Sequence, residues 1–177
     1  MNKYKLQVGF DEYPDNPREW GEPLTKMVCF HNRYELGDKH NYRQSDYSSW
    51  QELKEAILKE ENAVLIKPLY LYDHSGITIS TSPFSCPWDS GQVGFVYITQ
   101  ENKEQNKLSD EQTQELLDAE VREYDRYLIG EFYSYKILEL NTETLELECV
   151  TNCGGYESEE MARLEGEAEL KALMVSA

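Results

Sequence analysis

The sequence predicts a single α+β domain, residues 1–177, with a mostly antiparallel sheet and about three helices packed on it. A length of 177 residues suits one domain of ordinary size. Short segments with strand-like alternation are mixed with longer segments of helical periodicity. Several strand-like segments follow one another across short turns, and this order is typical of hairpins and meanders, whose strands pair antiparallel.

The chain begins with a predicted strand over residues 3–13, whose larger side chains recur at every second position: Tyr4, Leu6, Val8 and Phe10. Residues 14–23 contain three prolines and predict a loop. The apolar run 27–30 predicts a short strand, which could pair with the first one.

A helix is predicted over residues 49–60. Ser49 and Glu52 form the S-x-x-E pattern of a capping box, in which each side chain satisfies a backbone amide at the helix start. The residues that follow supply the apolar stripe of an amphipathic helix: Trp50, Leu53, Ile57 and Leu58.

The remaining strands are predicted from short apolar or β-branched runs. The run 63–72 is almost continuously apolar, as expected of a central strand, although Pro68 limits pairing at that point. Residues 82–90 contain two prolines and are expected to be irregular. The other predicted strands are 77–81 and 91–99, and 132–140 and 144–151, which form a hairpin.

Two further helices are expected in the second half of the chain. Ser109 begins a second capping box, so a helix is predicted over residues 109–128, with Gly130 as its end. After a predicted turn at Cys153-Gly-Gly, Ser158 is expected to cap a last helix that runs to Met174.

The net charge of −17 is unevenly distributed. Residues 1–100 contain 14 acidic and 10 basic residues, whereas residues 101–177 contain 20 acidic and 7 basic residues. Such a surface repels nucleic acid and favours basic partners, but it equally serves solubility. No apolar run is long enough to span a membrane, and no signal peptide is recognisable. We therefore expect a cytoplasmic protein whose four cysteines are reduced thiols.

Residues 68–97 are predicted to form the functional centre, because a buried strand runs into a dense set of polar side chains. Asp73-His74-Ser75-Gly76 ends that strand. His74 could act as an acid, a base or a ligand, oriented by Asp73 or Asp89. The same four residues are also typical of a hydrogen-bonded turn, and the sequence leaves both interpretations open.

The segment 82–92 is predicted to be a binding loop. It combines the side chains of Cys86, Trp88, Asp89, Ser90 and Gln92, and two prolines restrict its path. A thiolate nucleophile at Cys86 with an imidazole as base is one hypothesis. The competing one, which we favour for Cys86 alone, packs Cys86 and Trp88 into the core and uses Asp89 and Ser90 to cap amides.

The segment 29–40 supplies further polar groups. Arg33 offers a bidentate fork for a phosphate or carboxylate, and His31 lies close to it in sequence. Histidine, cysteine and aspartate residues of this segment and of 73–89 could form a zinc set, but no pair of them has a typical ligand spacing. We expect neither a metal nor a cofactor. The pair Cys149 and Cys153 has no second pair to complete a zinc site.

Four stretches resemble a family of small acidic proteins of bacteriophages and other mobile elements: PREW, MVCFHNRYELGDKHN, PLYLYDHSG and TSPFSCPWDSGQVGFVY. The later AEVREYDRYL is also similar. The resemblance implies a phage or plasmid accessory gene acting in the cytoplasm of a bacterial host. Such proteins often counter host defence by binding a host protein in place of DNA, or by sequestering or destroying a signalling nucleotide.

The predicted function is that of a non-enzymatic binding protein that modulates or inhibits a host factor. Its partner would be a host protein or a nucleotide-like small molecule, with no direct contact to nucleic acid or membrane. The alternative is a small hydrolase or nucleotide-processing enzyme that uses His74, Asp89 and Cys86. The predicted ligand-binding residues are His31, Arg33, Tyr72, Asp73, His74, Ser75, Cys86, Trp88, Asp89, Ser90 and Gln92.

Overall fold

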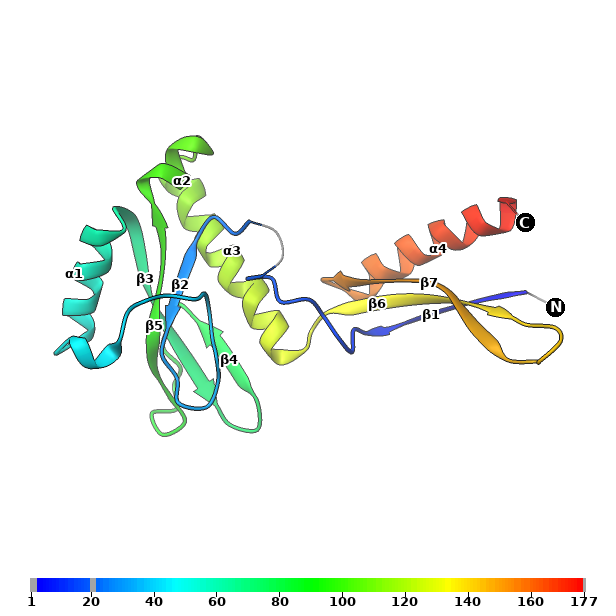
Figure 1. Cartoon of the computed structure of the whole chain (residues 1–177), viewed down its shortest axis with the longest axis horizontal. Helices are drawn as coiled ribbons and strands as arrows, with labels where there is room; N and C mark the ends of the chain where they lie inside the picture. Colours follow the sequence, from blue (N-terminus) through cyan, green and yellow to red (C-terminus); the bar gives the residue numbers. More distant parts are fainter. Residues whose placement is uncertain (1–2, 20–21, 177) are drawn as a thin grey trace. The chain divides into compact units, whose positions relative to one another are not determined.

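The structure, a computed structural model, describes residues 3–19 and 22–176 (Figure 1). The chain forms two compact units: unit 1 comprises Met1–Asp15 and Gly130–Ala177, and unit 2 comprises Asn16–Ile129. The predicted α+β class with antiparallel strands is confirmed. The described residues form two sheets rather than one, and four α-helices rather than about three.

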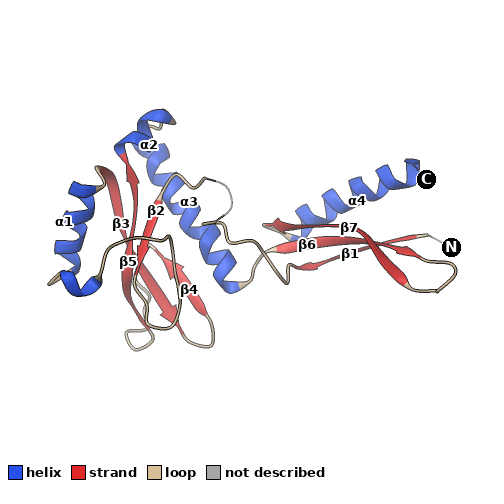
Figure 2. Cartoon of the chain, viewed as in Figure 1, coloured by secondary structure: helices blue, strands red, loops and turns tan. Residues whose placement is uncertain are grey.

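Unit 2 is built on a four-stranded antiparallel sheet in the order β2-β5-β3-β4 (Figure 2). The central position of β3 was expected from its apolar sequence. The suggested pairing of residues 27–30 with the first strand is wrong, because β2 pairs with β5. The strands of this sheet are β2 (Lys26–Cys29), β3 (Ala63–Asp73), β4 (Ile77–Ser80) and β5 (Ser90–Thr99).

Unit 2 has four helical segments, and its three α-helices begin at a side chain that caps the first turn. Ser49 caps α1 by accepting a hydrogen bond from the amide of Glu52 at 3.2 Å. Ser109 and Gln112 form a reciprocal capping box at the start of α3, at 3.1 and 3.0 Å. The helix α2 was not anticipated. The bounds are Gln44–Asp46 for the 3-10 turn η1, Trp50–Glu60 for α1, Gln100–Gln105 for α2 and Asp110–Ile129 for α3.

The sheet of unit 2 has an apolar core on each face, because successive strand residues point to opposite sides. Met27 and Cys29 pack with the buried stripe of α3, whereas Val28 packs with Leu53 and Ile57 of α1. The two helices therefore cover opposite faces of the sheet. The apolar part of the buried stripe of α3 consists of Leu117, Val121 and Tyr124.

Unit 1 contains a three-stranded antiparallel sheet in the order β1-β6-β7, with α4 packed on one face. Its second hairpin strand does not turn at Cys153-Gly154-Gly155 as predicted, but continues through them to Tyr156. Phe10 is 63% exposed, unlike the other alternating side chains of β1. The bounds are Tyr4–Phe10 for β1, Tyr133–Leu140 for β6, Leu147–Tyr156 for β7 and Glu159–Ser176 for α4.

Among the described helices, none is both long enough and apolar enough to cross a membrane.

Candidate functional site

The predicted segments 73–76 and 82–92 lie at one end of the unit 2 sheet, where β3 ends at Asp73 and β5 begins at Ser90. Pairing continues beyond the strands, since the amide of Asp73 donates to the carbonyl of Asp89 at 2.8 Å. The amide of His74 donates to the carbonyl of Gly76 at 3.0 Å and closes a tight turn. Ser75 has a φ of 59°, a left-handed conformation that such a turn requires. This turn agrees with the structural interpretation of the Asp-His-Ser-Gly sequence.

Asp73 is the meeting point of two segments that are distant in sequence. Its Oδ2 forms an ion pair with Nη2 of Arg33 and lies 3.7 Å from Nε2 of His31. The Nδ1 of His31 accepts a hydrogen bond from the amide of Arg33 at 3.2 Å, so a neutral imidazole carries its proton on Nε2, toward the carboxylate. The His31 ring stacks on Tyr34 at 5.0 Å. The segment 31–34 is thus fixed against the end of β3.

Asp89 contacts the other two side chains of the enzyme hypothesis, His74 and Cys86. Its Oδ2 lies 3.4 Å from Nδ1 of His74 and 3.5 Å from Sγ of Cys86. The carboxylate therefore contacts both the imidazole and the thiol. In a nucleophile–base pair the thiol would contact the imidazole directly. The geometry matches a polar cluster that orders the loop better than it matches such a pair.

Trp88 does not pack into the core, as the competing hypothesis required, but is 92% exposed. Pro87 precedes Trp88 and restricts the backbone of this loop. After Trp88, the hydroxyl of Ser90 donates a hydrogen bond to the carbonyl of Cys86. Cys86 itself is half-buried. The loop thus holds a large apolar side chain in solvent.

These groups border an open depression of about 400 Å³. Leu71 and Val93 supply its apolar part, and both also belong to the core beneath α3. Sequence reasoning missed these two, although each lies two residues from a lining residue, Asp73 or Gly91, and so on the same strand face. The remaining lining residues are His31, Arg33, Asp73, Trp88, Asp89, Ser90 and Gly91.

The other predicted binding residues do not line this depression. Tyr72 and Gln92 alternate with Leu71 and Gly91, so they point to the opposite face of the sheet. Tyr72 packs there against Phe84 at 5.8 Å. Ser75, like His74, lies on the neighbouring turn, where it is exposed, and Cys86 lies behind Asp89.

The residues considered for zinc are not assembled. Among residues 3–19 and 22–176, no three His, Cys, Asp or Glu side chains are arranged to hold a metal. His40 lies against Phe30 and its Nε2 is 3.0 Å from the carbonyl of Cys29. Burial raises the pKa of the Cys29 thiol to about 12, so this thiol stays protonated.

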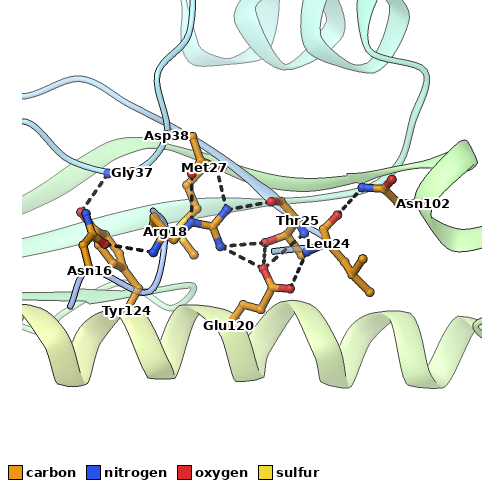
Figure 3. A network of polar contacts seen from close by, with 10 residues as sticks. All are labelled: Asn16, Arg18, Leu24, Thr25, Met27, Gly37, Asp38, Asn102, Glu120 and Tyr124. Atoms are coloured by element: carbon orange, nitrogen blue, oxygen red, sulfur yellow. Dashed lines mark hydrogen bonds and ion pairs between the residues drawn. The ribbon is translucent and has the colours of Figure 1, made fainter. Parts of the chain in front are cut away.

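A second polar cluster, which sequence reasoning missed, is structural. Arg18 lies between Asp38 and Glu120 and is only 8% exposed (Figure 3). Its guanidinium makes two hydrogen bonds to Asp38, at 3.1 and 2.6 Å, one to Glu120 at 2.9 Å, and two to Thr25. Glu120 also accepts hydrogen bonds from the amides of Leu24 and Thr25. The cluster ties the loop before β2 to α3.

The only sequence signal for this cluster was the PREW and LGD motifs, which contain Arg18 and Asp38. Trp20 of PREW lies outside the described residues.

Comparisons of the chain with protein-family models, with curated proteins and with solved structures found no match.

Proposed function

We propose that the chain is a non-enzymatic protein-binding protein that recognises its partner through the Trp88 surface, which we define as Trp88, His31, Arg33, Asp73 and Asp89. The observation that carries the proposal is the 92% exposure of Trp88 on an ordered loop. Burying roughly 200 Å² of a tryptophan at about 25 cal/mol/Å² is worth about 5 kcal/mol. A chain that leaves this side chain in solvent forgoes that stabilisation, and a partner that covers it gains it.

The neighbours of Trp88 match the composition of protein interfaces. Tryptophan and arginine are the residues that most often dominate binding energy, and here Arg33 borders the same depression. The ion pair of Arg33 with Asp73 and the fixed loop around Ser90 hold the surface in place. A pre-ordered surface loses less conformational entropy when it binds.

The charge of the Trp88 surface favours a protein over a nucleotide. It combines one guanidinium with the carboxylates of Asp73 and Asp89, and the guanidinium already pairs with Asp73. With neutral imidazoles its net charge is −1, which opposes a phosphate group. A basic or amphipathic side chain of a partner protein can instead pair with Asp89.

The resemblance of the motifs to phage and mobile-element proteins supplies the context of the proposal. In that context the partner is a host factor in the bacterial cytoplasm, and binding modulates or inhibits it. The acidic character of residues 101–177 supports the same direction, since it would steer a basic partner toward the chain.

The test is site-specific photo-crosslinking in bacterial cells. The photoreactive amino acid p-benzoylphenylalanine is placed at position 88, and in a matched variant at position 13. Tyr13 is also aromatic and 88% exposed, but it belongs to unit 1. We expect one host protein to be crosslinked from position 88 and not from position 13.

The affinity for that purified protein then decides the role of the surface. Trp88→Ala is expected to weaken binding by at least about 30-fold, which corresponds to about 2 kcal/mol. Arg43→Ala, an exposed change elsewhere in unit 2, is the control and should leave the affinity unchanged. Equal crosslinking from both positions, or full affinity of Trp88→Ala, would refute the proposal.

The second candidate, a small hydrolase, is favoured by one observation, the contact of His74 and Cys86 with the same oxygen of Asp89. It predicts that iodoacetamide modifies Cys86 much faster than a free cysteine near neutral pH, and that Asp89→Asn slows this reaction. We expect ordinary reactivity, because the imidazole contacts the carboxylate rather than the thiol.

A further inference from the structure

The helix α4 packs on the sheet of unit 1 through small residues. Ala162 is fully buried, and Gly166 lies so close to the sheet that an added Cβ would be 2.7 Å from Leu6 and 3.0 Å from Tyr135. Leu170 and Leu173 continue this stripe and are half-buried. With these four positions α4 satisfies its contact to the sheet.

The same helix carries a second apolar stripe that points away from the sheet. Met161 is 50% exposed, Leu164 60% and Val175 89%, and Ala168 between them is exposed too. At 3.6 residues per turn these four positions lie within about 60° of one another, on the side of the helix away from the stripe of Ala162, Gly166, Leu170 and Leu173. An amphipathic surface helix has one apolar stripe, so a helix with two is expected to be covered on both sides.

Glutamates border this outward stripe on both sides. Glu160 and Glu167 lie on one flank and Glu165 on the other, whereas Glu169 lies toward the sheet-facing side. The two basic residues of α4 do not reverse the sign, because Arg163 pairs with Glu159 and Lys171 is a single charge beside the stripe. The surface is therefore an apolar strip in an anionic frame.

The acidic frame excludes three of the usual occupants. Two copies of α4 would bring the glutamates of one against those of the other, and like charges oppose such a pairing. Anionic membrane surfaces and nucleic acids are repelled for the same reason. What fits is a helix whose apolar stripe is flanked by lysine or arginine.

We propose that the outward face of α4, defined as Met161, Leu164, Ala168 and Val175 with the flanking glutamates, docks a basic amphipathic helix of a partner protein. Helices commonly recognise one another through apolar anchors at i, i+3 and i+7, as in this stripe. The complementary charges set the orientation and speed association. This site lies in unit 1 and does not depend on the Trp88 surface.

The test uses a defined probe with the full-length chain. The probe is an 18-residue peptide of leucine and lysine, with leucines spaced to form one helical stripe, and its control is a scrambled peptide of the same composition. We expect the amphipathic peptide to bind at least tenfold more tightly than the scrambled one. In NMR spectra of the labelled protein, its chemical-shift changes should concentrate on the outward residues of α4.

Matched substitutions separate the stripe from its frame. Leu164→Gln is expected to lower the affinity for the peptide at least tenfold. Leu145→Gln, at a 75% exposed leucine of the same unit, should leave that affinity unchanged. The double change Glu160→Gln and Glu167→Gln should weaken binding at low salt and flatten its salt dependence. These residues are exposed, so circular dichroism should show unchanged folding.

Three results would overturn the proposal. One is equal binding of the scrambled peptide, and another is a chemical-shift map away from α4. The third is a concentration-dependent dimer, seen by sedimentation, that Leu164→Gln abolishes, because it would assign the face to a second copy of the chain.

Discussion

Replacing Arg18 tests whether the buried polar cluster of unit 2 holds the fold together. The guanidinium makes five hydrogen bonds, to Asp38, Glu120 and Thr25. The substitution Arg18→Ala removes all of them and leaves two carboxylates close together with little access to water. Their side chains are only 11% and 13% exposed.

The expected loss is about 3–5 kcal/mol, the usual cost of removing one partner from a buried ion pair. That is a large part of the roughly 5–15 kcal/mol by which a domain is stable. A lysine cannot restore it, because Asp38 accepts two parallel hydrogen bonds from the planar guanidinium. Apolar replacement of both carboxylates would not restore it either, since the amides of Met27 and Leu24 would lose their acceptors.

The measurement is urea unfolding followed by tryptophan fluorescence. All three tryptophans of the sequence fall in Asn16–Ile129, so the signal reports unit 2. Trp50 is the informative one, with its ring 5.9 Å from that of Phe95 in the core beneath α1. With a slope of about 2 kcal/mol/M, the midpoint should fall by roughly 2 M.

The matched control is Arg33→Ala, which also removes an arginine from an aspartate. The Arg33 side chain is 65% exposed, so its pair should contribute at most about 1 kcal/mol. If Arg18→Ala and Arg33→Ala shift the midpoint equally, the cluster does not stabilise the fold as argued.

Three further predictions concern thiols, pH and a strained turn. A thiol reagent should modify the exposed Cys149 and Cys153 of the native protein, and should reach the buried Cys29 only upon unfolding. The modified residues are identified by mass spectrometry, and fast modification of Cys29 in the native protein would contradict its burial. Burial raises the pKa of Cys29 and of Tyr124 to about 12, so these groups keep their protons in the folded chain while the unfolded chain loses them. The free energy of unfolding should therefore fall as pH rises from 9 to 12. Each group should contribute a loss of about 1.4 kcal/mol per pH unit above its ordinary pKa. Urea midpoints that stay constant over this pH range would refute this. Leu145 is 75% exposed and has a φ of 60°, a left-handed conformation that asparagine adopts more readily. Leu145→Asn should raise the free energy of unfolding by about 0.5–1 kcal/mol, measured by urea unfolding followed by circular dichroism, and a loss of stability would contradict it.

The elements that the sequence predicted are those fixed by neighbours along the chain. The helices at 49–60 and 109–128 could be predicted because Ser49 and Ser109 cap residues only three positions away. The hairpin of β6 and β7 could be predicted for the same reason, but pairing between distant strands could not, since β1 pairs with β6, more than 120 residues later. Local sequence patterns therefore suggest pairing of 27–30 with the nearest strand, and they contain no sign of a unit that combines the two chain ends.

The candidate site shows the same division. The approach of 31–33 to 73–89 was expected from the density of polar residues, and the structure brings His31, Arg33, Asp73 and Asp89 together. Density does not say which face of a strand a residue occupies. The predicted binding residues therefore contain Tyr72 and Gln92, although strand alternation places both on the opposite side of the sheet from Leu71.

The motifs that carry the family resemblance divide by what they do for the fold. Arg18 and Asp38 are buried in a satisfied cluster, so folding alone requires them, whatever the protein binds. Trp88 has no such role, because it is 92% exposed and adds nothing to either core. In the proposal above, Trp88 contributes to partner binding and not to the fold. Stability and binding should therefore separate, with Arg18→Ala lowering the urea midpoint and Trp88→Ala lowering affinity alone.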